Sequence, residues 1–458
     1  MFSKPYYTFT LIVIVYIAIA TLYAINTPKW QTPDEPAHFN YIRYIAETGT
    51  LPVLQRGDYD QEYLEKIKAA KFPASMSIDA IRYESYQPPL YYLAATPVYL
   101  ATRSAGLDAT VIALRLFSVA LGVLVLIVAY AILREIFAKR NDNLLALATV
   151  GAIATIPQHI AVSASISNDL AAEAVLALIL WLAVKRVNGA IRDSRFVVLG
   201  GIAFGAALLT KTTAYFPGAV ALIIAEITHA QGSRSAGEQG RNLRSTFHAS
   251  RFTFYDLLQL FALATLIAAP MFARNLLIYG ITDPLGIARH DAVVIGQPTT
   301  AEMIARFGLN KIVSDFFVVT FKSFWAQFGW MGVPVHERIY IALAALTVIT
   351  ILGHIFYAIR ILRQRDLLSP AQWWCAILLS AMIGVAVADY VLYNFKFLQF
   401  QGRYLFPALV PLALFLAIGL RELIPNVFRK IIFALLYIAL VALDVVCLFW
   451  FIVPQLKS

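Results

Sequence analysis

The run Tyr6–Ile25, YYTFTLIVIVYIAIATLYAI, decides the fold class, because it is strongly apolar and holds no charged residue. A helix of about 20 such residues crosses the hydrocarbon core of a bilayer. The apolar core of a cleavable signal peptide is shorter, at about 7 to 15 residues. We therefore interpret this run as a retained first membrane span.

Runs of the same kind recur along the chain. Of its 458 residues, 60% are hydrophobic and 14% are charged, and the mean hydropathy is +0.70. Soluble domains are closer to half apolar and a quarter charged, so the composition excludes a soluble enzyme. It predicts an all-α polytopic membrane protein with about eleven spans in a single integral membrane domain, residues 1–458. The further runs are Val111–Phe137, Leu144–Gln158, Leu170–Val187, Phe196–Thr210, Ala214–Thr228, Phe254–Ile278, Ile339–Leu362, Trp373–Tyr393, Tyr404–Leu420 and Ile431–Val453.

Two long segments interrupt the apolar runs, over residues 26–110 and residues 279–338. The first contains one apolar stretch, Pro88–Thr102, which is too short to cross a bilayer easily and includes Pro97. We expect it to lie in the membrane interface. The stretch Gln231–Arg251 is rich in Gly, Ser and Arg, which favours a flexible connection.

Basic residues cluster at every second connection between the runs. Lys and Arg in short loops prefer the cytoplasm, whereas long loops cross the membrane largely regardless of charge. If Pro88–Thr102 does not cross, every cluster is cytoplasmic and both long segments lie outside. The clusters are Arg134, Lys139 and Arg140; Lys185, Arg186, Arg192 and Arg195; Arg234, Arg241, Arg244 and Arg251; Arg360, Arg363 and Arg365; and Arg421, Arg429 and Lys430.

The net charge of +10 comes from 37 basic and 27 acidic residues. On a soluble face such an excess would indicate nucleic acid. Here the basic residues lie mostly between apolar runs, so we assign them to topology and to anionic lipid head groups, and expect no nucleic-acid partner. Cys375 and Cys447 both lie inside apolar runs, which indicates neither a disulfide scaffold nor a cysteine metal site.

The sharpest local feature is Pro33-Asp34-Glu35-Pro36-Ala37-His38, an acidic pair just beyond the first span. In a structural interpretation, Asp34 caps a helix and Pro36 occupies an early helical position. In a functional one, a carboxylate at the membrane boundary serves as a base or binds a cation. The pattern alone leaves both open. His38 lies one helical turn from Asp34, where we expect it to orient or hydrogen-bond.

On the predicted topology, other polar residues emerge at the same outer face. Each alone is typical of an interfacial anchor or a helix cap. Together, carboxylates and cations beneath two long segments favour a site for a phosphate-bearing ligand. These residues are Asn168-Asp169, Lys211 with its flanking threonines, Arg274, and Gln401-Gly402-Arg403-Tyr404.

Two motifs are set aside. The segment Gly205–Thr212 resembles a P-loop, but Thr210 replaces the second glycine and the segment belongs to a membrane run. Asp58-Tyr59-Asp60 has a spacing that some transferases use for a metal and a nucleotide sugar, but it lies in the outer segment, where nucleotide sugars are normally absent. Embedded ionisable residues that could mark a polar interior are Arg115, Glu173, Asp389 and Asp444.

An ordered set of short elements resembles the GT-C membrane glycosyltransferases that use polyprenyl-phosphate sugars. The closest groups are an uncharacterised bacterial and archaeal branch with a QGRYLFP element and the protein O-mannosyltransferase-like proteins with an Asp-Glu pair. The elements cover most of the chain. They are PDEPAHFNYIRYI from Pro33, ESYQPPLYYLAATPVYL from Glu84, RLFSVALG from Arg115, ISNDLAAEAV from Ile166, LLTKTTAYFPG from Leu208, SFWAQFGWMGVP from Ser323 and QGRYLFPALVPLAL from Gln401.

The resemblance implies a GT-C-like helical bundle whose first outer segment carries juxtamembrane helices. It implies transfer of a monosaccharide from a lipid phosphate to an acceptor hydroxyl, typically with inversion. By position, Asp34 matches the catalytic acid with Glu35 beside it, and Asp169 matches a second acidic position. Lys211 matches a lysine near the lipid phosphate, and Arg403 matches the basic residue of the QGRY element.

We accordingly expect Asp34 to be the base, assisted by Glu35, and Lys211, Arg274 and Arg403 to clamp the phosphate. Tyr404 and His38 join the substrate-binding residues. A divalent cation bridging a carboxylate to the phosphate is left open, with Asp34 and Asp169 as candidate ligands.

The expected partners are a polyprenyl-phosphate sugar, a glycan, lipid or protein acceptor, and membrane lipids, with the active site on the extracytoplasmic face of the cell membrane. Two alternatives remain. A transporter or flippase of a lipid-linked anion would use similar charges, although such proteins typically bind their ligands near the bilayer midplane. A noncatalytic envelope scaffold would also fit the spacing.

Overall fold

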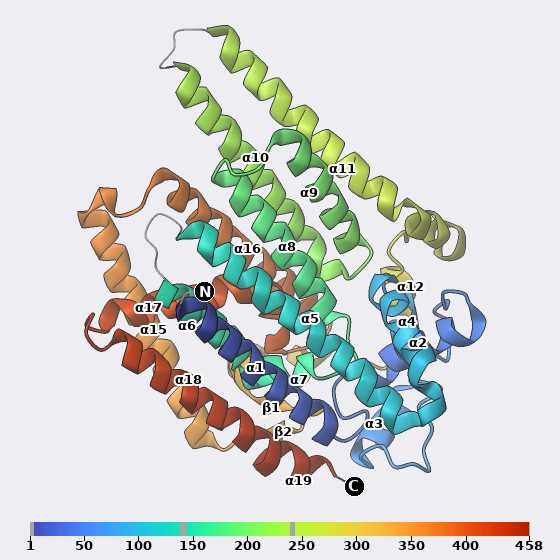
Figure 1. The fold of residues 1–458 in the computed structure, drawn as a ribbon. Helices are drawn as coiled ribbons and strands as arrows, with labels where there is room; N and C mark the ends of the chain where they lie inside the picture. The colour runs from blue at the N-terminus through green and yellow to red at the C-terminus, as the bar shows by residue number, and fades with distance from the viewer. Residues whose placement is uncertain (1–3, 138–142, 239–242, 458) are drawn as a thin grey trace.

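The computed structural model describes residues 4–137, 143–238 and 243–457, which fold into a helical bundle (Figure 1). From the N-terminus, the first helices are α1 (Lys4–Asn26), α2 (Glu35–Thr48), α3 (Gln61–Ala69), α4 (Leu90–Thr102), α5 (Leu107–Ile136), α6 (Asn143–Ala154), α7 (Pro157–Ser163), α8 (Asp169–Val187), α9 (Asp193–Leu208) and α10 (Tyr215–Glu238). They are followed by α11 (Leu243–Tyr279), α12 (Ile287–Val293), α13 (Thr300–Phe307), α14 (Leu309–Trp325), α15 (Glu337–Arg363), α16 (Pro370–Asn394), α17 (Leu409–Leu423), α18 (Arg429–Val446) and α19 (Val453–Leu456).

Short elements complete the chain. Strands β1 (Gln327–Phe328) and β2 (Val333–Pro334) pair antiparallel between α14 and α15. The 3₁₀ turns are η1 (Tyr83–Tyr86), η2 (Arg103–Ala105), η4 (Thr212–Ala214), η5 (Arg365–Leu367) and η6 (Gly402–Ala408), and a π-helical segment, η7 (Cys447–Ile452), joins α18 to α19.

Among the described residues, eight segments are long and apolar enough to cross a membrane. They are Pro5–Asn26, Leu107–Ile136, Thr212–Gln231, Phe254–Tyr279, Glu337–Arg363, Pro370–Asn394, Gly402–Leu423 and Arg429–Leu456. The pair α6 and α7, bent by 64°, would make a ninth span. The remaining two predicted runs form α8, which carries charged residues at both ends, and α9, whose 16 residues cover only about 24 Å. The chain is therefore an all-α polytopic membrane protein, as the composition predicts.

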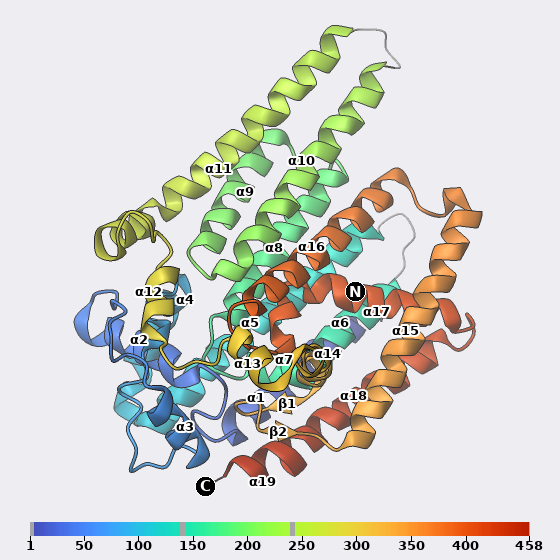
Figure 2. The same cartoon turned by 180° about the vertical axis from the view of Figure 1, so that it is seen from behind.

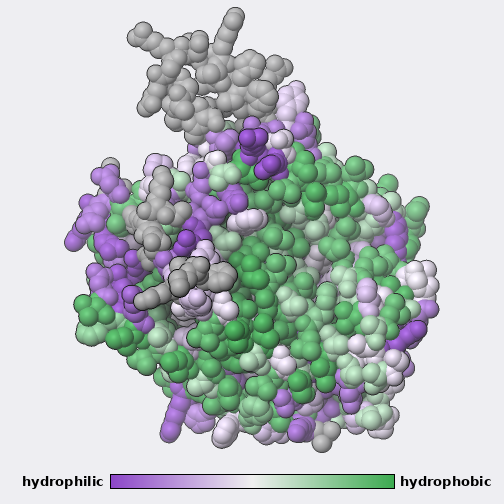
Figure 3. Space-filling model, in the orientation of Figure 1, coloured by the Kyte–Doolittle hydropathy of each residue, from purple (hydrophilic) through white to green (hydrophobic). Residues whose placement is uncertain are grey.

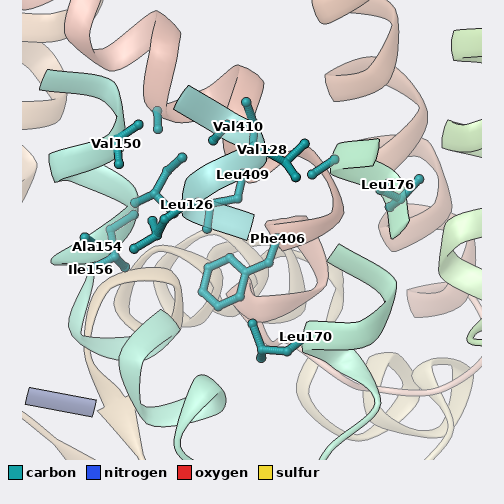
Figure 4. Packing of buried hydrophobic residues seen from close by; sticks show 14 of the residues in the cluster. Leu126, Val128, Val150, Ala154, Ile156, Leu170, Leu176, Phe406, Leu409 and Val410 are labelled. Carbon is teal, nitrogen blue, oxygen red and sulfur yellow. The ribbon is translucent and has the colours of Figure 1, made fainter. Parts of the chain in front are cut away.

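The apolar side chains divide between the interior and the outer surface. One large buried cluster joins the central helices, and its part around Phe406 combines side chains of α5, α6, α8 and α17 (Figure 4). Large apolar residues also cover the outside of the bundle, for example Ile341, Leu352 and Phe356 on α15. Figure 3 shows a broad hydrophobic surface across the middle of one face. Such a surface fits contact with lipid rather than water.

The two long interrupting segments meet at one end of the bundle. Helices α2 and α4 of the first lie near α12 of the second in both views (Figures 1 and 2), and η1 of the first contacts α12. A shared apolar cluster joins them, with Ile67 and Tyr83 from the first segment and Val294 from the second. Helix α4 has 13 residues and packs against α2 and α5. At about 20 Å it is too short to span a bilayer alone, in agreement with the prediction for Pro88–Thr102.

One prediction for the connections is wrong. The expected flexible stretch Gln231–Arg251 is helical wherever the structure describes it, because α10 runs to Glu238 and α11 starts at Leu243. These two helices extend beyond the rest of the bundle (Figure 1). Residues 239–242 lie outside the described residues, as do Lys139, Arg140 and Arg241 of the basic clusters.

Candidate active site

Asp34 lies at the start of α2 but does not cap it. Its backbone is left-handed, with φ 68° and ψ −7°, and its side chain makes no capping hydrogen bond. Instead, the Tyr83 hydroxyl donates to Oδ1 at 2.7 Å, and the Arg403 guanidinium pairs with Oδ2. Asp and Asn tolerate this backbone region better than other residues with a Cβ atom. The capping interpretation of Asp34 is therefore wrong for its side chain.

Asp34 and three further charged side chains form a row in which the charges alternate in sign. Arg403 Nη1 lies 3.5 Å from Asp169 Oδ2, and the other oxygen of Asp169 pairs with Lys211 Nζ. The order is Asp34, Arg403, Asp169 and Lys211, which we call the charge cluster. Each member comes from a different part of the chain. Three residues predicted to lie at the outer face, Asp169, Lys211 and Arg403, thus lie together with Asp34.

The QGRY element is held in place by a close backbone contact. A Cβ atom on Gly402 would lie only 2.3 Å from the backbone nitrogen of Phe324 in α14, so only glycine fits here. The Gly402 N–H donates to Ser323 Oγ at 2.7 Å, and Arg403 Nε donates to Gln401 Oε1 at the same distance. The buried ring of Phe406 anchors the same turn in the core (Figure 4). Arg403 is thereby oriented before any ligand binds.

The other two members of the charge cluster, Asp169 and Lys211, lie where helices begin or end. Asp169 is the first residue of α8, and Ser167 Oγ donates to its Oδ2 at 3.0 Å. Lys211 follows the end of α9 in extended conformation and precedes η4. Neither residue is solvent-exposed, with side-chain exposures of 18% for Asp169 and 13% for Lys211. Partial burial strengthens electrostatic interactions compared with those in water.

The charge cluster borders a cavity of about 490 Å³. Asp34, Lys211 and Arg403 line it, together with the predicted binding residues His38 and Tyr404. Further lining comes from the first polar segment (Tyr59, Tyr83, Glu84, Tyr86), the second polar segment (His290, Gln297, Trp330) and α16 (Asp389, Tyr390, Tyr393). Polar groups, tyrosine rings and cationic side chains around one cleft suit a ligand with both a sugar-like and an anionic part.

Asp34 and His38 differ in charge near pH 7, because their surroundings keep the carboxylate ionised and the imidazole ring neutral. Burial alone would raise the pKa of the Asp34 carboxyl, but the charge of Arg403 and the hydrogen bonds from Arg403 and Tyr83 bring it below its usual range. Burial lowers the pKa of His38 to about 3, so its ring is neutral near pH 7. His38 Nδ1 lies 2.9 Å from the Tyr92 hydroxyl. His38 is thus placed as a neutral hydrogen-bonding group.

Glu35 does not reach the cavity. Its side chain is fully buried, and Arg115 Nε and Nη2 each donate to one carboxylate oxygen at 2.7 Å. The backbone N–H of Trp30 donates to Oε2 at 2.9 Å, and that of Ile166 donates to Oε1 at 3.3 Å. Arg115 also donates to the carbonyls of Ala24, Thr27 and Pro28. The expected assisting role at the reaction centre does not fit this position.

Arg274 is also absent from the cavity. Its Nη2 donates to the carbonyls of Leu51 and Pro52, at 3.1 and 2.6 Å. The predicted third cation of the clamp instead fastens the first polar segment to the end of α11. Of the other embedded residues, Glu173 Oε2 lies 2.9 Å from His159 Nε2, within hydrogen-bond distance. Asp444 is buried, and within the described part of the chain its carboxylate oxygens have no hydrogen-bond partner.

Glu84 and Tyr83 were not identified by the sequence pattern, although both line the cavity. They form part of η1, and the only sequence signal is an acidic and aromatic turn before Pro88-Pro89. No group of three or more His, Cys, Asp or Glu side chains placed to hold a metal ion occurs in the described part of the chain. Asp34 and Asp169, the candidate metal ligands, each face a cation instead.

The fold and site define a polytopic helical membrane protein with a charged cavity at one end of the bundle. The chain belongs to the family described as "Predicted membrane protein (DUF2142)", whose model matches residues 68–413. No protein with a curated description matches it.

Three solved structures show the kind of protein that the chain resembles in shape. The Archaeoglobus fulgidus oligosaccharyltransferase AglB, in complex with an inhibitory peptide and a dolichol-phosphate, has 14% identity and a TM-score of 0.48 over 98% of this chain and 55% of its own. ArnT from Cupriavidus metallidurans, bound to undecaprenyl phosphate, has 15% identity and a TM-score of 0.44 over 98% and 73%. The S. cerevisiae protein O-mannosyltransferase Pmt1-Pmt2 complex, bound to the sugar donor, has 18% identity and a TM-score of 0.40 over 58% and 33%.

The chain spans about half the length of the oligosaccharyltransferase it matches. Both the identities and the TM-scores are low, so the assignment of an activity rests on the charge cluster and the cavity.

Proposed function

We propose that the protein is a glycosyltransferase that moves a monosaccharide from a polyprenyl-phosphate carrier to an acceptor hydroxyl, with inversion at the anomeric carbon. The observation that carries the proposal is the charge cluster, in which Arg403 pairs with Asp34 and Lys211 pairs with Asp169, while Asp34, Lys211 and Arg403 line one cavity. Charged groups held in place around a cleft are suited to stabilise charge that develops during a reaction.

Lys211 and Arg403 hold the phosphate of the donor in this proposal. In the free protein each cation pairs with a carboxylate, Lys211 with Asp169 and Arg403 with Asp34. A phosphate competes for these donors, and a guanidinium can bind it through two parallel hydrogen bonds. As the bond to the sugar breaks, the departing phosphate gains negative charge, which both cations stabilise.

Asp34 is the carboxylate that we place next to the reacting sugar. Its pairing with Arg403 and its lowered pKa keep it ionised near pH 7. A negative charge beside the anomeric carbon stabilises the positive charge that develops there when the phosphate leaves. Glu35, sealed against Arg115, positions Asp34 by fixing the start of α2.

In this proposal the cavity opens on the extracytoplasmic face of the cell membrane, and the alternation of basic clusters along the chain supports this orientation. The acceptor is then a glycan, lipid or protein at that surface. The cavity is bordered by both outer segments, through which an acceptor would enter. If the loaded enzyme uses a divalent cation, Asp34 and Asp169 would be its candidate ligands, and the cation would neutralise negative charge on the phosphate.

Purified protein in liposomes with labelled polyprenyl-phosphate sugars and a membrane extract as acceptor source tests this function. A transferase consumes the donor and yields free polyprenyl phosphate with a labelled product, both measured by mass spectrometry. Movement of an intact donor between leaflets would show a transporter instead. Failure to consume any donor, with the protein folded, would contradict the proposal.

A further inference from the structure

Another carboxylate that lines the same cavity, Glu84, forms no ion pair with any residue that the structure describes. Glu84 is the second residue of η1, and its neighbour Tyr83 reaches Asp34 through its hydroxyl. Glu84 is 9% exposed and lines the cavity, and its Oε2 has no hydrogen-bond partner among the residues that the structure describes. An unpaired buried carboxylate oxygen costs free energy, so its retention beside a ligand cavity calls for a partner that the ligand supplies.

Several groups face Glu84 from the elements around it. They are Asp34 at the start of α2, Tyr92 on α4, Lys211 before η4, His290 on α12, Tyr393 on α16 and Tyr404 in η6, with Gln87 from its own segment. Burial raises the pKa of Glu84 to about 7, and the negative charge of Asp34 adds to this effect, while Lys211, His290 and Gln87 oppose it.

Two of the carboxylates that line the cavity, Asp34 and Glu84, therefore differ in their protonation. Asp34 is held ionised by Arg403, whereas Glu84 gains and loses a proton near neutral pH. A pair of acidic groups whose environments push their pKa values in opposite directions is typical of a division of roles in catalysis. A general base works best when its pKa lies near the working pH.

We propose that Glu84, rather than Asp34, accepts the proton of the acceptor hydroxyl. This inference rests on the proposed function. The acceptor oxygen forms a bond to the anomeric carbon, and the bond from that carbon to the phosphate oxygen breaks. The electron pair leaves with the phosphate, which Lys211 and Arg403 hold, and the hydroxyl proton moves to the free oxygen of Glu84.

The proposal fixes the sign of the pH dependence. Below about pH 7 Glu84 is protonated and cannot accept a proton, so transfer should fall about tenfold per pH unit at saturating donor. Above that pH the rate should reach a plateau. A base with the low pKa of Asp34 would instead give a flat profile through this range.

The test is the rate of sugar transfer in liposomes between pH 5.5 and 8.5, for the parent and three variants. Glu84→Gln should lower the plateau by roughly 100-fold and remove the rise with pH. Glu84→Asp should keep a rise with a displaced midpoint at a lower rate, because its carboxylate is one methylene shorter. Glu62→Gln, which removes an exposed carboxylate of α3, should leave the profile unchanged.

A parent-like rate and profile for Glu84→Gln would overturn the role of Glu84 while leaving the proposed function intact. No transfer by the parent protein at any pH would instead overturn the proposed function. Glutamine has the shape of glutamate, and Oε2 has no partner to lose, so we expect the variant to fold. If it does not, Glu84→Asp decides, because an unchanged rate and midpoint would contradict the inference.

Discussion

Two consecutive carboxylates, Asp34 and Glu35, lie in opposite environments. Glu35 is sealed in the interior, where Arg115 and two backbone N–H groups satisfy both of its oxygens. Asp34 faces the cavity, where its partners Arg403 and Tyr83 also line the wall. The backbone at Asp34 is left-handed, with φ 68°, just before the first turn of α2. The side chains of Asp34 and Glu35 therefore point in different directions.

An ion pair does not by itself indicate a functional site. The Glu35 and Arg115 pair has no access to a ligand, and it ties α2 to α5 and to the end of α1. The charge cluster includes a similar guanidinium and carboxylate contact, but a ligand can reach and replace it. Substitutions in the first pair should therefore change stability, and those in the second should change activity.

The largest expected effect on stability comes from Glu35→Ala. It leaves the charge of Arg115 buried, which should cost about 3–5 kcal/mol of unfolding free energy. Thermal unfolding in detergent measures this loss. The matched control is Asp108→Ala, which removes an exposed partner of Lys29 and should cost less than about 1 kcal/mol. Equal effects of the two substitutions would contradict the structural role of Glu35.

A smaller effect, on activity, is expected from Arg403→Lys. Lysine keeps the charge but cannot present two parallel donors to a phosphate. Loss of one charge-assisted hydrogen bond corresponds to roughly a tenfold or greater rise in the donor KM. The control Arg274→Lys alters a guanidinium that holds the carbonyls of Leu51 and Pro52, and its donor KM should change by less than about twofold. A parent-like KM for Arg403→Lys would remove Arg403 from the phosphate site.

Apolar runs and charge alternation were sufficient to predict the helical membrane fold, and they also grouped Asp34, Asp169, Lys211 and Arg403 at one end. The fold and the grouping of these residues both follow from short-range sequence patterns and from the lipid environment. The direction of a side chain around its helix axis could not be obtained in this way, and Arg274 was therefore wrongly placed in the clamp. Glu84 was missed because a 3₁₀ turn within a polar segment has no hydrophobic periodicity that would indicate burial.

The helical course of Gln231–Arg251 was missed for another reason. Its Gly and Ser residues favour a turn, but the stretch also contains Ala, Gln, Leu and Arg, which support helix. Continuation of α10 and α11 from the spans outweighs the local preference over residues 231–238 and 243–251.

In the proposed mechanism, Asp34 acts on the reacting sugar, whereas its neighbour Glu35 stabilises the fold. The most direct measurement is the rate of sugar transfer per folded molecule for Asp34→Asn and Glu35→Gln in liposomes. Asp34→Asn keeps the shape and loses the charge, so transfer should fall by roughly 100-fold or more while the unfolding temperature changes little. Glu35→Gln should lower the unfolding temperature, with a much smaller change in transfer per folded molecule. Transfer by Asp34→Asn at the parent rate would contradict the proposed role of Asp34 beside the reacting sugar.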